Sequence, residues 1–367
     1  MQLTRRISLA LVALAIGATG VTGASCARRA SVSTHRGAIS LHGAYYVDDD
    51  HTMVGTGAIR ANVPITDRVS VHGNYGLDII SSASVDVVAT ASRVFEARHA
   101  FGGGFAGSPD SRTTLQARYR GSREPDYRSD GLTLAVDRET EDRMRSFRAE
   151  VRARYDLVGP GFVFARAEPL GVVTASVSIT QVLDRLTLLR VAAQTDVQAG
   201  AMTSPYRYVF LAGAAYPEHV PSVRVRQAAL VRVQRSLVPT LSVWGEYDLT
   251  LDSWGVQVHT GEVAAQWEIA RWLRIDARAR WTVQGAASFY RSAYDQLTDY
   301  RTRDRSLGDV LTFWPRVGIR INLPGWPSER TWEVGAAAAM LHQTFPGFRP
   351  LDQRTAAVLE AWVERLF

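Results

Sequence analysis

The chain has 367 residues and a formal net charge of +6, and this length suits either two ordinary domains or one membrane barrel. All of its basic residues are arginines, which are dispersed along the sequence, so the charge does not indicate a nucleic-acid-binding patch. Cys26 is the only cysteine, so the chain cannot form an internal disulfide, whether or not it is cleaved near that residue.

The amino terminus has the three regions of a secretory signal peptide. Arg5 and Arg6 precede an apolar run from Ile7 to Ile16, and small residues follow as far as Cys26. This run is shorter than the ~20 residues that a membrane-spanning helix needs, and no later apolar stretch approaches that length. Any membrane insertion of the mature chain is therefore expected to use strands.

We predict three regions along the chain: a cleaved signal peptide at 1–26, a short N-terminal periplasmic segment at 27–36, and a single barrel at 37–367. An uncleaved membrane anchor is the alternative for the first region. The small residues before Cys26 also resemble a poor lipoprotein box, so either removal or lipidation of this cysteine fits the sequence.

Segments of alternating apolar and polar residues begin after residue 36. A period of two separates the two kinds of side chain onto the two faces of a strand. In the first half we predict strands at 37–47, 53–63, 69–79, 85–98, 112–120 and 147–156. The polar insertion at 121–142 is predicted to be a loop with a short hairpin near 132–136. The segment 159–170 is an ambiguous strand.

The second half alternates more regularly. We predict strands at 173–180, 189–197, 223–234, 241–249, 254–267, 272–282, 316–322, 331–342 and 354–367. The clearest is 272–282, in which apolar and charged side chains alternate strictly. We expect its apolar set to face lipid and its charged set to face the lumen, and the two sets are Leu273, Ile275, Ala277 and Ala279 against Arg274, Asp276, Arg278 and Arg280.

These segments number about 16, or 14 if 159–170 does not span. Short turns alternate with long loops, as the periplasmic and extracellular connections of an outer-membrane barrel do. The predicted fold is therefore all-β, a transmembrane antiparallel up-and-down β-barrel in the outer membrane. A soluble β-sandwich is the alternative, because a half-exposed sheet also alternates.

Aromatic residues support the membrane prediction. The terminal Phe367 resembles the final aromatic of bacterial outer-membrane proteins, which the barrel-assembly machinery reads, so we expect Phe367 to be an assembly signal. Other aromatics gather at strand ends and predict interfacial girdles: Tyr45, Tyr46, Tyr75, Trp254, Trp267, Trp272, Trp281, Trp326 and Trp332.

Six short segments resemble those of a known family in order and spacing. They are Asp78–Ser84 (DIISSAS), Glu124–Ser129 (EPDYRS), Ile179–Leu183 (ITQVL), Ser204–Arg207 (SPYR), Tyr247–Gly255 (YDLTLDSWG) and Gln284–Tyr290 (QGAASFY). The family is the group of outer-membrane barrels called domain of unknown function 3570. The resemblance implies an outer-membrane barrel and implies neither an activity nor catalytic residues.

Arginines on the expected inner faces are the main chemical feature. The lumen-lining residues that we predict are Arg118, Arg152, Arg154, Arg224, Arg226, Arg232, Arg274, Arg278, Arg280, Arg316 and Arg320, with Asp276 among them. Rings of arginine attract anions, which predicts a passive pore. The same residues can instead form a lattice of ion pairs in a plugged, non-conducting barrel, a scaffold that binds a periplasmic or lipoprotein partner.

No constellation in the sequence supports an enzyme, a cofactor or a metal site. His72 and Asp78 near the serines of 81–84 are the best hydrolase candidates, and we interpret them as ordinary loop and strand residues. The acidic residues at 48–50, and Asp295 with Asp299, are interpreted as solvated loop charges near lipopolysaccharide rather than as cation ligands. The expected surroundings are thus outer-membrane lipid and lipopolysaccharide.

Overall fold

A computed structural model of the chain describes residues 37–82, 94–159, 167–204, 207–324, 331–348 and 351–367. The predicted signal peptide at 1–26, the segment 27–36 and Trp326 lie outside these residues. Within the described residues, no helix is long and apolar enough to cross a membrane.

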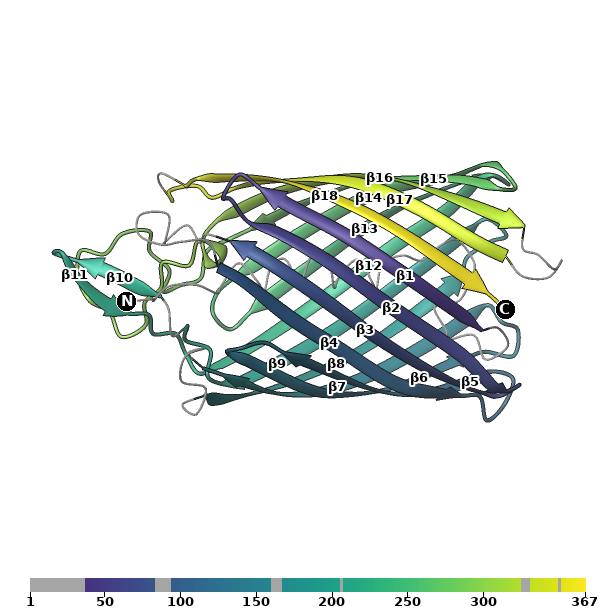
Figure 1. Cartoon of the computed structure of the whole chain (residues 1–367), viewed down its shortest axis with the longest axis horizontal. Helices are drawn as coiled ribbons and strands as arrows, with labels where there is room; N and C mark the ends of the chain where they lie inside the picture. The colour runs from purple at the N-terminus through teal and green to yellow at the C-terminus, as the bar shows by residue number, and fades with distance from the viewer. Residues whose placement is uncertain (1–36, 83–93, 160–166, 205–206, 325–330, 349–350) are drawn as a thin grey trace.

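Sixteen strands form one closed antiparallel barrel (Figure 1). Its first half consists of β1 (Ala38–Asp48), β2 (Met53–Thr66), β3 (Val69–Ser82), β4 (Val94–Gly107), β5 (Thr113–Arg123), β6 (Tyr127–Glu139), β7 (Arg145–Val158) and β8 (Glu168–Val182). Its second half consists of β9 (Thr187–Gly200), β12 (Val223–Val238), β13 (Leu241–Asp252), β14 (Gln257–Ala270), β15 (Leu273–Gln284), β16 (Val310–Pro324), β17 (Thr331–Thr344) and β18 (Gln353–Leu366). The predicted fold class is confirmed.

The barrel closes where β1 pairs with β18. The register runs from Ala38 opposite Leu366 to Asp48 opposite Ala356. Beyond the strand ends, the Gly37 amide donates to the Phe367 carbonyl at 2.9 Å, and the Phe367 amide donates back to the Gly37 carbonyl at 3.0 Å. A methyl group added to Gly37 would overlap the Phe367 ring, so the glycine leaves the space in which that ring lies.

The two faces of the barrel wall differ as the alternation predicts. On β15, Trp281 and Ala277 are exposed on the outer face, while Asp276, next to Ala277, is buried on the inner face. The same division holds on β7, where Val151 and Tyr155 are exposed and Asp156 is buried. Apolar side chains thus cover the outside, and polar side chains point to the interior.

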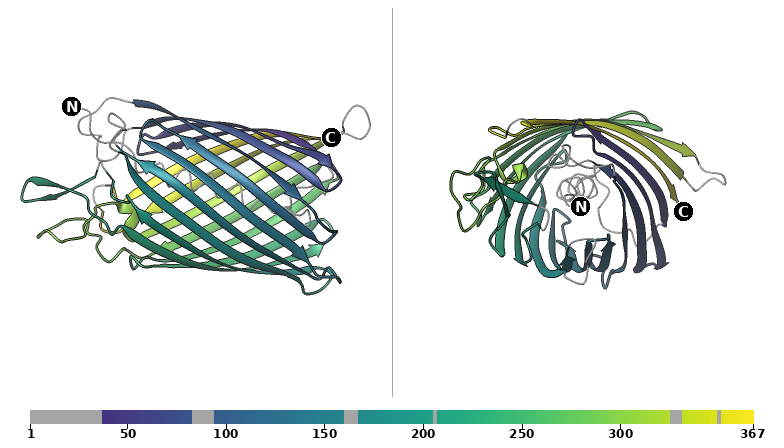
Figure 2. Two further views of the ribbon diagram at one scale, coloured as in Figure 1. Left: turned by 90° about the horizontal axis from the view of Figure 1, so that it is seen from below. Right: turned by 60° about the vertical axis from the view of Figure 1, so that its left-hand side comes forward.

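The two ends of the barrel differ in their connections. At one end, which we call the short-turn end, two to five residues join β2 to β3, β4 to β5, β6 to β7, β8 to β9, β12 to β13 and β14 to β15, and the chain terminus lies there. At the opposite loop end, the connections β9–β12 and β15–β16 are long. The first of these carries the hairpin of β10 (Tyr208–Leu211) and β11 (Ala214–Pro217), which projects beyond the barrel (Figures 1 and 2).

The strand count is as predicted, although one strand is not where we predicted it. The insertion at 121–142 is not a loop with a short hairpin, because β6 crosses the whole wall between β5 and β7. The ambiguous segment 159–170 lies mostly outside the described residues, and its last residues belong to β8, which begins at Glu168 and contains the predicted strand 173–180. The predicted strand 85–98 ends too early, since β4 extends to Gly107, and its residues 85–93 lie outside the described residues.

Most of the predicted girdle aromatics that the structure describes are exposed on the outer face, including Trp267, Trp272 and Trp332. Two are not. Tyr46 is only 3% exposed and donates to the Asp48 carboxylate inside the barrel, at 2.7 Å. Trp254 is 5% exposed and packs among the connections of the loop end. A position near a strand end does not distinguish an interfacial aromatic from one that turns inward.

Trp281 lies across the neighbouring strand at a glycine. A methyl group added to Gly261 on β14 would overlap the Trp281 indole. We expect Gly261→Ala to lower stability by about 1–3 kcal/mol, because inserting an atom into a packed site forces strain. The measurement is the temperature at which the fast-migrating folded form disappears from an SDS gel.

Gly245→Ala on β13 is the matched control, because no atom lies within 4 Å of its added methyl group. Equal melting of the two variants would show that the indole is free to move away.

Candidate functional site

A row of charged side chains crosses the inner face from β12 to β15. Arg232 lies opposite Glu246, Glu246 opposite Glu262, and Glu262 opposite Arg280 in the strand register. Arg280 pairs with Glu262 at 2.9 Å, and Arg232 pairs with Glu246 at 2.9 Å and with Glu262 at 3.7 Å. The two adjacent carboxylates would repel each other, and the flanking guanidinium groups offset that repulsion.

Glu262 is 2% exposed and is also reached by the Trp244 indole N–H at 3.2 Å. The sequence interpretation missed this residue, because a glycine precedes it and the charged row is visible only across strands. Glu262 lies two residues from Thr260 and two residues from Ala264, so a period of two places all three on the same, inner face, and this is the signal that could have identified it.

A second group lies on β15 to β18. Arg316 donates to Asp276 and to Glu360, both at 2.8 Å. Arg320 lies 3.7 Å from Glu333, and its guanidinium carbon lies 5.5 Å from the centre of the Trp362 ring. Each arginine therefore reaches a carboxylate on a neighbouring strand.

A third group lies on β8, β9, β12 and the end of β13, with Trp254 in the turn that follows. Asp196 accepts from Thr174 at 2.9 Å and from Arg226 at 3.2 Å. Arg224 pairs with Asp252 and lies over the Trp254 ring, with 4.3 Å between its guanidinium carbon and the ring centre. A guanidinium group stacks well on an aromatic face, so the Trp254 ring orients the Arg224 guanidinium toward the Asp252 carboxylate.

The wall of β5 to β7 has a different balance of charge. Glu150 accepts from Arg118 at 3.1 Å, from Arg148 at 2.6 Å and from Arg152 at 3.1 Å. Arg154 lies 2.9 Å from the fully buried Asp156. One carboxylate is thus shared by three guanidinium groups.

Two of the predicted arginines, Arg274 and Arg278, have no ion pair among the described residues, although both lie on the inner face of β15. The Nε atom of each is buried without a hydrogen-bond partner among the residues that the structure describes. The structure therefore pairs most, and not all, of the arginines that the sequence singled out.

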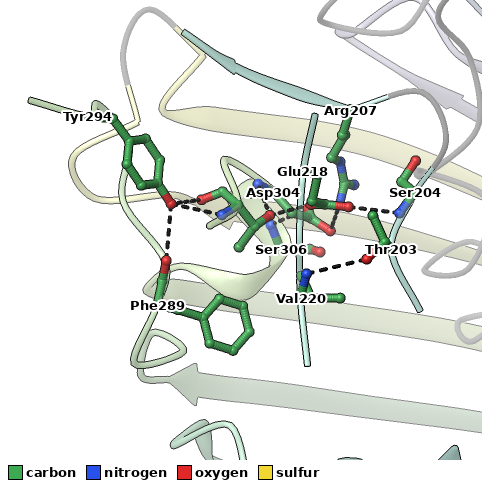
Figure 3. A network of polar contacts seen from close by, with 10 residues as sticks. Thr203, Ser204, Arg207, Glu218, Val220, Phe289, Tyr294, Asp304 and Ser306 are labelled. Atoms are coloured by element: carbon green, nitrogen blue, oxygen red, sulfur yellow. Dashed lines mark hydrogen bonds and ion pairs between the residues drawn. The ribbon is translucent and has the colours of Figure 1, made fainter. Parts of the chain in front are cut away.

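The connections at the loop end meet in a second polar network (Figure 3). Glu218, which follows β11, is only 4% exposed and accepts from the Thr302 hydroxyl and from the Ser204 amide, the latter at 2.9 Å. Arg207 pairs with Asp304 and lies 3.4 Å from Glu218. This network joins the β9–β12 connection to the β15–β16 connection.

The loop-end network extends across the rim to the first turn of the barrel. Arg305 pairs with Asp50 in the β1–β2 turn and donates to the Leu351 carbonyl, in the β17–β18 connection, at 3.2 Å. Its guanidinium carbon lies 4.4 Å from the centre of the Phe345 ring. We call the contacts of Arg305 with Asp50, Phe345 and Leu351 the rim clasp.

Apolar packing supports these polar contacts. Trp254 meets Phe289 edge to face with 5.2 Å between ring centres, and both pack with Val220 and Ala287. Burial raises the pKa of Tyr290 to about 12, so this phenol stays neutral at physiological pH.

Comparison with known proteins identifies one part of the chain. Residues 167–324 match the model of a family described as a protein of unknown function (DUF3570). Over these residues the chain is similar to that family. The matched region runs from the start of β8 to the end of β16, and two of the segments that resemble the family, 247–255 and 284–290, meet at the loop end, where Trp254 packs against Phe289.

Among solved structures, the fold is similar to a bacterial polysaccharide outer membrane secretin, with a TM-score of 0.53 and 11% identity over 90% of this chain and 98% of that chain. It is also similar to the outer membrane protein opdK from Pseudomonas aeruginosa, with a TM-score of 0.46 and 8% identity over 90% of this chain and 99% of that chain. A search of the curated proteins gives no match. The secretin match shows the barrel fold, and the closed wall with its apolar outer face places this barrel in the outer membrane.

The hydrolase candidates are not brought together. Asp78 accepts from Thr56 at 2.7 Å and pairs with Arg98 at 2.5 Å, whereas His72 lies six residues away on the same strand. Ser81 lies on the opposite face of β3 from Asp78 by strand alternation, and Ser84 lies outside the described residues.

The interpretation of the acidic turn at 48–50 as solvated charge is wrong for two of its residues. Asp48 and Asp50 are each 8% exposed, and they are engaged by Tyr46 and by Arg305 respectively. Asp295 and Asp299 are exposed, as predicted. Within the described ranges, no group of three or more His, Cys, Asp or Glu side chains is arranged to hold a metal ion.

Glu262 offers the sharpest test of the inner row. We expect Glu262→Gln to destabilise the barrel by about 3 kcal/mol, because breaking a buried ion pair leaves arginine charge without compensation. Denaturant titration of the barrel in lipid vesicles measures this change.

Arg112→Gln is the control, since its ion pair with Glu141 at 2.6 Å lies in exposed turns at the short-turn end. No measurable loss is expected there. Similar losses for both variants would mean that burial adds nothing to the inner row.

Proposed function

We propose that this barrel is a passive pore of the outer membrane with an arginine-rich lumen. The observation that carries the proposal is the presence of exposed polar side chains on the inner face. Arg60, Asn74, Arg120 and Gln194 are all exposed there, while the apolar residues beside them face outward. Side chains inside a wall are exposed only where the interior leaves room for water.

The proposed lining of this path consists of residues on β5, β7, β12, β15 and β16. They are Arg118, Arg152, Arg154, Arg224, Arg226, Arg232, Arg274, Asp276, Arg278, Arg280, Arg316 and Arg320. A barrel of 16 strands is wide enough for an aqueous channel. Guanidinium groups along such a channel favour anions over cations. The proposal involves no chemical catalysis.

Planar lipid bilayers test the pore directly. We expect purified, folded protein to give discrete conductance steps and, in a salt gradient, a reversal potential of the sign that anion preference requires. Heat-modifiable migration and β-type circular dichroism would establish that the sample is folded. A folded sample that never conducts would contradict the pore.

The loop end supports a second candidate, a plugged barrel that acts as a scaffold for a periplasmic or lipoprotein partner. The β15–β16 connection reaches past the β17–β18 connection to the β1–β2 turn through the rim clasp. A connection held across the rim in this way narrows the mouth. The two candidates differ in whether the remaining path conducts.

The rim clasp gives a prediction that separates them. We expect Arg305→Ala to raise the mean conductance of an already conducting barrel, because the variant loses the Asp50 ion pair and frees the loop. Arg291→Ala is the control, since its side chain contacts only carbonyls of its own loop, at Ser288 and Tyr290. A silent wild-type protein in which Arg305→Ala alone restores current would favour the plugged barrel.

Phe367 is proposed as the signal that the barrel-assembly machinery reads. Its ring is 45% exposed and lies against Gly37 at the short-turn end. An exposed terminal aromatic is available to a partner, whereas its backbone already pairs with Gly37. The ring can therefore serve recognition as well as packing.

Deletion of the terminal residue distinguishes these two uses. We expect loss of Phe367 to reduce the amount of folded barrel in cells severalfold while leaving folding into detergent micelles in vitro nearly unchanged. Phe367→Tyr, which keeps an aromatic ring, should behave as the wild type does. An equal defect in cells and in vitro would show that the ring acts only by packing.

A further inference from the structure

The inner wall of β2 to β5 and β7 carries arginines that exceed the nearby carboxylates. Five arginines lie there, Arg60, Arg118, Arg120, Arg148 and Arg152, and three of them, Arg118, Arg148 and Arg152, share Glu150 and Asp137. The five arginines therefore exceed the two carboxylates with which they pair, and Arg60 and Arg120 have no ion pair among the described residues.

The opposite wall is balanced. On β12 to β18, four neighbouring arginines stand against four carboxylates: Arg232, Arg278, Arg280 and Arg316 against Glu246, Glu262, Asp276 and Glu360. The surplus is therefore a local property of one wall and not a consequence of arginine content alone.

The arginines without carboxylate partners stand near one another. Arg60 lies opposite Asn74, which lies opposite Gly102, which lies opposite Arg120 in the register of β2 to β5. Arg120 has no ion pair among the described residues, and its charged neighbours include Arg152, Arg118 and Arg60. Mutual repulsion of this kind is relieved when an anion binds between the charges.

Glycines on β4 make room beside these side chains. A methyl group added at Gly102 would stand 2.8 Å from the Asn74 amide oxygen and 3.4 Å from Cγ of Arg120. At Gly104 it would stand 2.8 Å from Nε2 of His72. Polar side chains of β3 and β5 thus lean over a strip of β4 that has no side chains of its own on the inner face.

His72 supplies an independent observation, because its hydrogen-bonding capacity is unused. Both of its ring nitrogens are buried, and neither has a hydrogen-bond partner within the described part of the chain. The Nε atoms of Arg118 and Arg152 are likewise buried without a partner there, as are those of Arg274 and Arg278 on the opposite wall, so it is His72 that distinguishes the basic side. Buried polar atoms are nearly always satisfied in folded proteins, so donors left open around one surplus of charge call for an acceptor.

We propose that Arg60, His72, Arg118, Arg120 and Arg152, the basic wall, form a binding site for small oxoanions that carry two or more negative charges. This inference deepens the proposed pore function, because the site would set which anions the path favours. Phosphate and carboxylate oxygens match the planar fork of a guanidinium group, whereas chloride offers no second acceptor. Exposure of Arg60 and Arg120 on the inner face gives such an anion access from the lumen.

Binding of inorganic phosphate to the folded barrel in detergent tests the site without any need for conduction. Titration calorimetry at fixed pH and ionic strength should show phosphate binding, with succinate binding comparably and acetate at least about tenfold more weakly. Arg120→Gln should weaken phosphate binding about tenfold, and Arg60→Gln with Arg120→Gln further, since each removes charge-assisted hydrogen bonds.

Arg190→Gln is the matched control. Arg190 is also an inner-face arginine without an ion pair among the described residues, but it lies on β9 opposite Arg232 of β12, with β8 between it and β7, and its charged neighbours include Arg232, Glu246 and Arg148. It should leave phosphate affinity unchanged. Equal losses in Arg120→Gln and Arg190→Gln, or no saturable phosphate binding to the folded wild-type barrel, would overturn the site.

Conductance then separates the two proposals. A barrel that conducts but binds no phosphate keeps the pore and loses the site, and a barrel that binds phosphate without conducting keeps the site and loses the pore. If both hold, phosphate added to the bath should reduce chloride current in the wild type and not in the double variant.

Discussion

The constraint on which this structure depends is that backbone amides and carbonyls in lipid must find partners within the protein. An unpaired group in hydrocarbon costs several kcal/mol, so a wall of strands has to close on itself. Here the closure joins the first and last strands, and the Gly37 and Phe367 backbones extend it to the short-turn end. Closure fixes an inside and an outside for each strand, and the period-two pattern follows from that.

The inside of such a wall is where charge has to be managed. Arginine is suited to this interior because its side chain is long enough to pass over the neighbouring strand and bind a carboxylate on the strand after it. Arg118 on β5 reaches Glu150 on β7, and Arg316 on β16 reaches Glu360 on β18. These ion pairs join strands that share no backbone hydrogen bonds, so they stiffen the wall across its ladder.

The period-two pattern of apolar and polar residues predicts much of this structure from the sequence, whereas specific strands and loop contacts do not follow from it. The faces of β15 could be predicted residue by residue, since both neighbours of each strand impose the same alternation. β6 was missed because only Leu132, Leu134 and Val136 mark its outer face, while charged residues occupy both of its ends. The pairing of Arg207 with Asp304 joins loops 97 residues apart, and no period in the sequence encodes such a contact.

From the sequence alone, an ion-pair lattice and an anion path are alternatives for the lumen as a whole. The distribution of carboxylates makes it a property of each wall. Where Glu246 and Glu262 stand in the same row as Arg232 and Arg280, the charges neutralise one another and the row fills space. Where Glu150 and Asp137 serve Arg118, Arg148 and Arg152, the arginines outnumber the carboxylates that pair with them among the described residues. A lattice on one wall and an anion-attracting surface on the other can therefore coexist in one barrel. The ion-pair lattice makes the barrel rigid, and this rigidity keeps the arginines of the other wall in place despite their mutual repulsion.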